Sequence, residues 1–309
     1  MILCITLNPV VDMTFYVDEL APVYRTEARR TTHVAGGKGN NAARALIGLG
    51  HEVRALLPLG GASGRHEAEL LAQDGIQTAI AWTSGETRIV VTLIDKQHQM
   101  RAYFAPGAPF TADDATRVRE RFDDALAENI TAMCLCGSSP GPLADNLYLE
   151  FLKTAAARGI PTLLDTYGEA LELSLQAPPT IVKVNHAEAE TLLGRSLSTQ
   201  SAQLDALEVL RAGGARWSVL TLGEEGALLG AAGIQWLARP PRIEALNPIG
   251  SGDAMTAGLL AGLVRGEPAE ACLRLGMASA VASALHWDAG RITTADVQPL
   301  LPRIEITRL

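Results

Sequence analysis

Short apolar runs alternate with amphipathic stretches along most of this chain, and that alternation constrains the fold more than any other feature. Met1 to Leu7 is predicted to be a buried strand, and Asn40 to Leu49 a helix that ends at Gly50. The pattern repeats as a strand from Val53 to Leu59 and a helix from Gly64 to Asp74, and the chain closes with predicted helices at 254–264, 269–275 and 277–285. Strands that alternate with helices form βαβ units, so we predict an α/β protein with a mainly parallel central sheet flanked by helices.

Two stretches, approximately 12–34 and 86–105, interrupt that rhythm. They alternate polar and apolar residues, as in Arg88-Ile89-Val90-Val91-Thr92-Leu93-Ile94. Such alternation is typical of antiparallel strands with one exposed face. We therefore predict a single domain over residues 1–309 that carries a small inserted β-sheet as a lid. The alternative is a pair of edge hairpins without a function.

Charge and hydropathy exclude several classes of protein. Lys and Arg number 26 against 34 Asp and Glu, a formal net charge of −8, and the absence of a basic cluster argues against nucleic-acid and anionic-membrane partners. No apolar run reaches the roughly 18 residues of a transmembrane helix, and Met1 to Ile5 lacks a basic segment of a signal peptide. We expect a cytoplasmic protein whose 4 cysteines are buried, reduced thiols rather than a zinc site.

The first candidate site is Gly36-Gly37-Lys38-Gly39-Asn40-Asn41-Ala42. It has the spacing G-x-G-x-x-A, but a dinucleotide-binding turn requires a hydrophobic strand directly before it, which Thr31 to Ala35 does not provide. It does not match a P-loop either. A glycine-rich turn that opens a helix still presents free backbone N–H groups, and Lys38 adds a positive charge. We predict a site for an anionic or polyhydroxylated ligand, with a purely structural turn as the alternative.

The second candidate site is Asn247-Pro248-Ile249-Gly250-Ser251-Gly252-Asp253, which runs into an apolar helix from Ala254 to Val264. A Gly-x-Gly turn at a helix start directs backbone donors and the positive end of the helix dipole at one spot, which suits a transferring phosphoryl group. Asp253 is either a capping carboxylate or a general base for an attacking hydroxyl. A cap explains neither the flanking glycines nor the apolar helix, so we favour the base.

Two further segments are less specific by themselves. Asn185 and Glu188 follow a predicted strand and either hold hydrated Mg²⁺ or form a helix cap. Thr221 to Gly226 is a strand end followed by a turn with two glycines. That turn suits close approach by a nucleotide, and an ordinary hairpin is the alternative.

In this order and spacing, the segments resemble the ribokinase/PfkB family of carbohydrate kinases from Leu7 to about Ile292. The likeness is greatest to its sugar-phosphate kinases, 1-phosphofructokinase and tagatose-6-phosphate kinase. It implies a ribokinase-like fold and an ATP-dependent transfer of a phosphoryl group to a sugar hydroxyl. The segments that carry it are Thr6 to Asp12, Gly36 to Arg44, Thr87 to Val91, Leu164 to Leu171 and Asn247 to Met255.

The resemblance also implies roles for individual residues. Asp253 would be the catalytic base, with Gly250, Ser251 and Gly252 as the anion hole for the γ-phosphate. The residues at the sugar phosphate would be Asp12, Gly37, Lys38, Asn41, Arg88, Ser138 and, reaching into a neighbouring subunit, Arg25. Those at ATP would be Lys183, Asn185, Thr221, Gly223 and Gly226, with Glu188 near Mg²⁺. The segment from Ala284 to Arg291 resembles the family's monovalent-cation loop, so K⁺ stays open as a further cofactor.

The expected reaction converts a ketohexose phosphate, foremost fructose 1-phosphate, to a bisphosphate such as fructose 1,6-bisphosphate. Tagatose 6-phosphate and fructose 6-phosphate are the alternatives. A non-catalytic sugar-phosphate or nucleotide sensor would not need the base at Asp253, and a nicotinamide dehydrogenase is disfavoured by the missing strand before Gly37.

Two expectations concern departures from the family pattern and the assembly. The departures are Ser138-Ser139-Pro140, Lys183-Val184-Asn185, Tyr167 and Asn40, and the first and last of these are expected to touch the sugar-phosphate pocket. Apolar residues along the lid strands predict a homodimer that packs lid to lid. They are Val17, Ile89, Val91 and Phe104.

Overall fold

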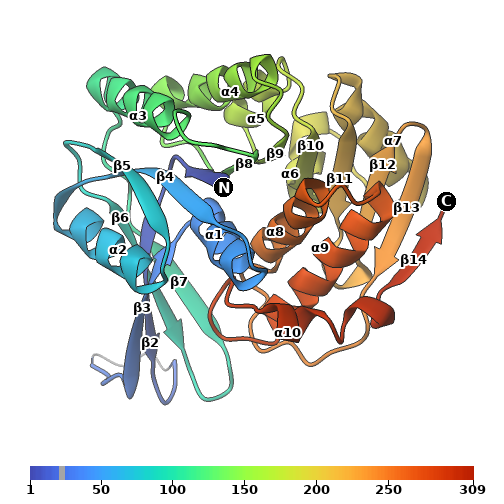
Figure 1. Ribbon diagram of the computed structural model, residues 1–309. Helices are drawn as coiled ribbons and strands as arrows, with labels where there is room; N and C mark the ends of the chain where they lie inside the picture. The colour runs from blue at the N-terminus through green and yellow to red at the C-terminus, as the bar shows by residue number, and fades with distance from the viewer. Residues whose placement is uncertain (21–24) are drawn as a thin grey trace.

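The computed structural model describes residues 1–20 and 25–309, which form two β-sheets with helices packed around the larger one (Figure 1). The large sheet has the strand order β14-β13-β12-β11-β10-β9-β8-β1-β4-β5, and every pair from β5 to β11 is parallel. The predicted α/β fold with a mainly parallel sheet is confirmed. The parallel strands are β1 (Ile2–Thr6), β4 (Val53–Leu59), β5 (Gln77–Trp82), β8 (Ala132–Cys136), β9 (Thr162–Asp165), β10 (Ile181–Asn185) and β11 (Trp217–Thr221).

Both faces of this sheet are covered because successive residues of a strand point to opposite sides. In β1, Ile2 and Cys4 belong to one apolar cluster, and Leu3 and Ile5 belong to the other. On the first face pack α1 (Lys38–Gly48), α2 (Gly61–Gln73), α8 (Ser251–Val264), α9 (Ala269–Ala284) and α10 (Thr294–Val297). On the second pack α3 (Ala112–Ala125), α4 (Pro142–Ala157), α5 (Glu169–Ser174), α6 (His186–Leu193) and α7 (Gln200–Ala212).

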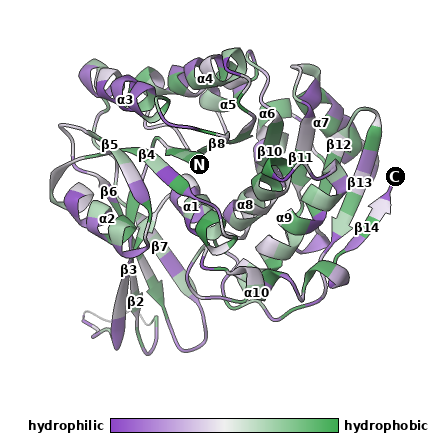
Figure 2. Ribbon diagram, viewed as in Figure 1, coloured by the Kyte–Doolittle hydropathy of each residue, from purple (hydrophilic) through white to green (hydrophobic). Residues whose placement is uncertain are grey.

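Helix α8 lies deep in the molecule, whereas α3 lies at its surface. The residues from Asp253 to Gly262 are all buried. Figure 2 shows polar residues along α3, which buries only one side against the sheet. Among the described residues, none of the helices has the length and apolar character that crossing a membrane requires.

The small sheet lies apart from the large one, at the lower left in Figure 1. Its order is β3-β2-β6-β7, with β3 at Arg30–Gly36, β2 at Val10–Tyr16, β6 at Arg88–Ile94 and β7 at Met100–Phe104. The outer pairs are antiparallel as predicted, but the central pair β2–β6 is parallel, because the two strands enter from the same edge of the large sheet. The part of the predicted lid that falls on residues 21–24 lies outside the described residues.

Three further strands of the large sheet were not predicted. The large sheet continues beyond β11 with three antiparallel strands, β12 (Ala227–Ala231), β13 (Ile234–Arg239) and β14 (Glu305–Arg308).

Two separate closing helices, 269–275 and 277–285, were predicted, and the structure has the single helix α9 in their place. The helix continues through Gly276 because α8 crosses it there: a Cβ on Gly258 would lie 2.7 Å from the Cα of Gly276. Gly276 therefore allows α8 and α9 to pack closely and does not end the helix.

Candidate active site

A cleft of about 450 Å³ lies between the carboxyl edge of the parallel strands and the small sheet. Alternate residues of a strand point to the same side, so one face of the small sheet lines the cleft. That face includes Asp12, Thr14 and Tyr16 of β2 and Val90, Thr92 and Ile94 of β6. At the large sheet, Gly137, Asn185 and Thr221 line it at or just after strand ends, and Lys183 lines it from within β10. Open α/β sheets bind ligands at this edge.

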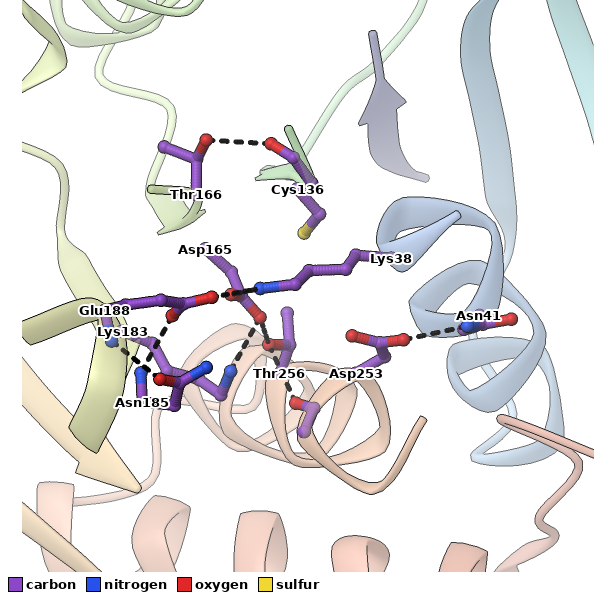
Figure 3. Close-up of polar contacts among 12 residues, drawn as sticks. Lys38, Asn41, Cys136, Asp165, Thr166, Lys183, Asn185, Glu188, Asp253 and Thr256 are labelled. Atoms are coloured by element: carbon purple, nitrogen blue, oxygen red, sulfur yellow. Dashed lines mark hydrogen bonds and ion pairs between the residues drawn. The ribbon is translucent and has the colours of Figure 1, made fainter. Parts of the chain in front are cut away.

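Asp165, the last residue of β9, is the centre of a buried polar network (Figure 3). Lys38 Nζ donates to Asp165 Oδ1 at 3.0 Å, and Lys183 Nζ donates to Asp165 Oδ2 at 2.6 Å. Thr256 Oγ1 also donates to Oδ2, at 2.9 Å. Burial by itself would raise the pKa of Asp165, but the charges of Lys183 and Lys38 outweigh it and hold the pKa well below its usual range. Asp165 is therefore ionised and draws both ammonium groups to the floor of the cleft.

Glu188 contacts both Lys38 and the end of β10. Its Oε1 accepts from Lys38 Nζ at 3.0 Å, and its Oε2 accepts from the Asn185 backbone N–H at 2.9 Å. Asn185 Oδ1 in turn accepts from the Glu188 N–H at 2.8 Å, which completes a capping box at the start of α6. The helix cap weighed from the sequence is present, and both residues also line the cleft.

Asp253 lies in the first turn of α8, buried, with Asn41 Nδ2 donating to its Oδ2 at 2.8 Å. Burial, and after it the charge of Asp165, raises the pKa of Asp253 to about 6, although Lys38, Asn41 and Lys183 act to lower it. A carboxylate with a pKa near neutrality in a cleft is a candidate general base.

The turn before Asp253 forms the N-terminus of α8. Gly250 has a φ of +82°, and a Cβ there would lie 3.1 Å from the Cα of Ala289, so the turn requires glycine. A Cβ on Gly252 would lie 3.6 Å from Lys183 Nζ, so that ammonium group lies beside the turn. Within the described part of the chain, Ser251 Oγ is buried without a hydrogen-bond partner. An unsatisfied hydroxyl at a helix N-terminus fits an anionic ligand.

On the opposite side of the cleft, Arg88 and Ser138 are linked through Asn8. Arg88 Nη2 donates to the Asn8 carbonyl oxygen at 3.0 Å, and Asn8 Nδ2 donates to Ser138 Oγ at 3.0 Å. Burial lowers the pKa of Arg88 and raises the pKa of Asp12, which shares this side of the cleft. The structure thus brings Asp12, Gly37, Lys38, Asn41, Arg88 and Ser138 to one cleft with Asp253.

Several residues singled out from the sequence lie elsewhere. Gly223 and Gly226 are not among the cleft-lining residues, and Gly226 allows close approach of Ala238, whose carbonyl carbon would lie 3.0 Å from a Cβ. Arg25 is 81% exposed and pairs with Glu27. Asn40 was expected to touch the sugar-phosphate pocket, but it is not among the cleft-lining residues.

The Asn40 side chain points into the interior instead. Its Nδ2 donates to Glu67 Oε1 at 3.0 Å and to the Gly36 carbonyl oxygen at 2.8 Å. Burial raises the pKa of Glu67 to about 8. The Asn40 amide therefore connects a buried carboxyl group to the backbone of the glycine turn.

The expectation that no strand precedes Gly37 is wrong. A strand, β3, does end at Gly36 directly before the turn. It belongs to the small sheet, pairs antiparallel with β2 and is mostly polar, so the turn does not join the parallel strands of a dinucleotide-binding unit.

Sequence reasoning did not assign roles to Asp165, Thr256 and Arg44. A usable signal for Asp165 was its position after the apolar run of β9, because carboxylates at the carboxyl ends of parallel strands converge at one edge. Thr256 and Arg44 lie in helices and carry no such signal. Only the crossing of α1, α8 and β9 brings their side chains into the network.

Comparison with known proteins accords with this fold and site. The family described as pfkB family carbohydrate kinase matches residues 2–294, and the chain belongs to that family. It is accordingly a phosphotransferase that acts on a sugar hydroxyl, and membership of a kinase family implies ATP and Mg²⁺.

Individual relatives cover almost the whole chain. A 1-phosphofructokinase of Xanthomonas campestris pv. campestris is 34% identical over 95% of this chain and 94% of its own. A tagatose-6-phosphate kinase of Staphylococcus epidermidis is 29% identical over 99% of both. The structure of Escherichia coli phosphofructokinase-2 in complex with fructose-6-phosphate matches with a TM-score of 0.87 and 25% identity over 97% of this chain and 98% of that one.

Proposed function

We propose that this protein is an ATP-dependent sugar-phosphate kinase whose general base is Asp253 and whose foremost substrate is fructose 1-phosphate, which it converts to fructose 1,6-bisphosphate. Tagatose 6-phosphate and fructose 6-phosphate are the alternative acceptors. The observation that carries the proposal is a buried carboxylate with a pKa of about 6 at the N-terminus of α8, within a cleft that also holds Lys38, Arg88 and Lys183. The names of the relatives support the sugar-phosphate class.

Asp253 would accept the proton of the attacking sugar hydroxyl. The hydroxyl oxygen forms a bond to the γ-phosphorus as the bond from that phosphorus to the β,γ-bridging oxygen breaks, and ADP leaves. Asn41 holds one oxygen of Asp253, so the carboxylate is oriented before the sugar binds. A folded-state pKa of about 6 leaves the carboxylate mostly ionised at neutral pH.

The start of α8 would receive the γ-phosphate. Ser251 supplies a buried hydroxyl with no partner in the described structure, and the Gly250–Gly252 turn supplies backbone N–H groups. The Ser251 N–H already donates to the Pro248 carbonyl oxygen, at a long 3.3 Å. Phosphate binding is expected to compete with that bond.

The nucleotide would extend toward Lys183 within β10 and toward Asn185 and Thr221, which end β10 and β11. Asn185 and Glu188 offer oxygen ligands beside this path, which suits Mg²⁺ because it takes few protein carboxylates and binds substrate phosphates. The ion would neutralise charge on the phosphates. Gly223 and Gly226 would shape the turn after β11 and thereby the nucleotide side of the cleft.

The sugar phosphate would lie between the glycine turn and the small sheet. Asp12 and Gly37 would hold the sugar hydroxyls, and Arg88 and Ser138 would lie at the phosphate end. Phosphorylated sugars are favoured over free sugars because the cleft holds positive groups in a chain of net charge −8. Arg25 does not reach this cleft within the described chain, and its proposed role requires a second subunit.

Two features of the assembly form part of the proposal. The small sheet would act as a lid because one of its faces lines the cleft. Tyr103 of β7 is 57% exposed and does not line the cleft, which suits the predicted lid-to-lid homodimer, whereas the exposed Phe104 next to it lines the cleft. Light scattering at micromolar concentration tests it, and a monomer there would contradict it.

The deciding experiment is coupled ADP release with ATP across fructose 1-phosphate, fructose 6-phosphate, tagatose 6-phosphate and the free sugars. The expected result is the highest kcat/KM for fructose 1-phosphate. A non-catalytic sensor would bind ligands in calorimetry without releasing ADP. Repeating the assay in K⁺ and Na⁺ buffers tests a monovalent cation at the 284–291 loop.

A further inference from the structure

Arg44 is buried in the interior of the protein and donates hydrogen bonds in four directions. Its Nε donates to Asp74 Oδ2 at 2.8 Å, and its Nη2 to the Ala35 carbonyl oxygen at 2.9 Å. Its Nη1 donates to Asn41 Oδ1 and to the Ala289 carbonyl oxygen, each at 3.0 Å. A guanidinium buried at the cost of desolvation and satisfied on every side is a rigid anchor.

Arg44 thereby determines which way the Asn41 amide faces. A guanidinium has only donors, so the Asn41 oxygen must face it. The NH₂ group then faces the opposite way, where it donates to Asp253 Oδ2 at 2.8 Å. Because an ionised carboxylate only accepts, both contacts require the same amide orientation.

We propose that Arg44 is a positioning residue for the phosphoryl transfer: through Asn41 it holds one oxygen of Asp253 and leaves the other free for the sugar hydroxyl. The inference rests on the proposed function of Asp253 as the base. Within the described residues the network runs from Asp74 through Arg44 and Asn41 to Asp253, and the Asp253 Oδ1 atom accepts no hydrogen bond.

The same guanidinium ties a second wall of the cleft to α1. Ala289, which accepts from Arg44, lines the cleft beside Gly250. The next residue, Gly290, has a φ of +72°, and a Cβ there would lie 3.2 Å from the Cα of Asn41. Arg44 therefore holds the 289–290 loop against the backbone that carries Asn41.

The test measures the pKa of Asp253 directly, by ¹³C-detected carboxyl titration of the ligand-free protein, with the resonance assigned from Asp253→Asn. In Arg44→Met the Asn41 amide loses its anchor, and we expect the pKa of Asp253 to rise by about one unit. The acid limb of the kcat/KM profile should move by the same amount. Activity lost at pH 6 should then largely return at pH 8.5.

A double-mutant cycle separates positioning from a general effect on the fold. In an Asn41→Ala background, Arg44→Met should shift the Asp253 pKa no further, because Arg44 acts through Asn41. Arg265→Met is the matched control: Arg265 Nη2 donates to the Leu49 carbonyl oxygen at 3.1 Å, at the other end of α1, and its loss should leave the Asp253 pKa unchanged. Arg44→Lys keeps the charge but loses the planar fork, so it should shift the Asp253 pKa in the same direction. It takes the place of Arg44→Met if that variant does not fold.

An unchanged Asp253 pKa in a folded Arg44 variant would overturn the inference, as would an equal shift in the Asn41→Ala background. The titration needs no turnover, so it also separates this inference from the proposed function. Full turnover by Asp253→Asn would show that Asp253 is not the base. Arg44 would then have no positioning role in catalysis, whatever the titration gives.

Discussion

Lys183 Nζ lies 2.6 Å from Asp165 Oδ2, with the two side chains 4% and 0% exposed. Asp165 holds Lys38 with its other oxygen, so one carboxylate serves two buried ammonium groups from different parts of the fold. The negative charge of Asp165 also helps to raise the pKa of Asp253. The arrangement therefore couples the stability of the cleft to the chemistry proposed for it.

Removing Asp165 should strongly destabilise the protein. Asp165→Ala leaves Lys38 and Lys183 without a partner, and the loss of one member of a buried ion pair costs about 3–5 kcal/mol. Glu172→Ala, at an exposed carboxylate of the neighbouring α5, is the control and should cost no more than about 0.5 kcal/mol. Denaturant unfolding measures both, and equal effects would show that the network contributes little to stability.

The stability of the wild type should fall in acid because of the same residue. The folded-state pKa of Asp165 is lowered, so its contribution is fully present above its unfolded pKa of about 4 and is lost as the pH falls through the folded value. Urea unfolding between pH 7 and pH 2 should show this loss. Asp165→Asn should flatten that dependence.

Replacing Asp253 by Asn should remove the base and keep the shape of the site. Turnover is expected to fall by roughly 100- to 10,000-fold, the contribution typical of a general base. ATP affinity by calorimetry should change little, because the amide stays at the same position in the first turn of α8. Near-normal turnover would rule out Asp253 as the base.

The pH profile should report the same carboxylate. The base must be ionised to accept the hydroxyl proton, so kcat/KM should rise with pH, with an apparent pKa of about 6. Initial rates from pH 5 to pH 8 in buffers of constant ionic strength measure it. A profile that stays flat down to pH 5 would contradict a raised pKa.

Glu67 should make the wild type less stable as the pH rises. Its folded-state pKa is about 8, so between about pH 4.5 and 8 the folded state holds more protons than the unfolded state, and stability falls with increasing pH. Glu67→Gln cannot ionise and keeps a polar group beside Asn40. Relative to wild type, its free energy of unfolding should improve by about 3–4 kcal/mol from pH 5 to pH 8, and an equal pH dependence of the two proteins would be the contrary result.

Arg88 should matter chiefly for phosphorylated sugars. Arg88→Ala removes a charged donor at the proposed phosphate end, so the KM for a sugar phosphate should rise about 10- to 100-fold. Arg65→Ala, at an exposed arginine of α2, is the control and should leave the KM unchanged. If Arg88→Ala weakens free fructose as much as fructose 1-phosphate, its assigned role is wrong.

Local patterns sufficed for the parallel core and the two glycine turns. The strand at Val53–Leu59 was predicted with its observed bounds, because a buried parallel strand is a continuous apolar run. The parallel pairing of β2 with β6 was not predicted, because strand direction in a sheet depends on where the chain enters it. Two helices were predicted on either side of Gly276 in place of the single α9, because the local sequence carries no information about the neighbouring helix at Gly258.

The sequence alone determined the class of fold and the chemistry the chain can carry: apolar periodicity sets which segments are strands and helices, and the Gly-Ser-Gly-Asp turn provides donors and a carboxylate at a helix start. Only the tertiary structure decided the state of those groups. Asp165 pairs with two lysines 127 and 18 positions away, and Asn41 reaches Asp253 across 212 positions. A pKa depends on burial and on charges within a few ångströms, and those distances exist only in the folded chain.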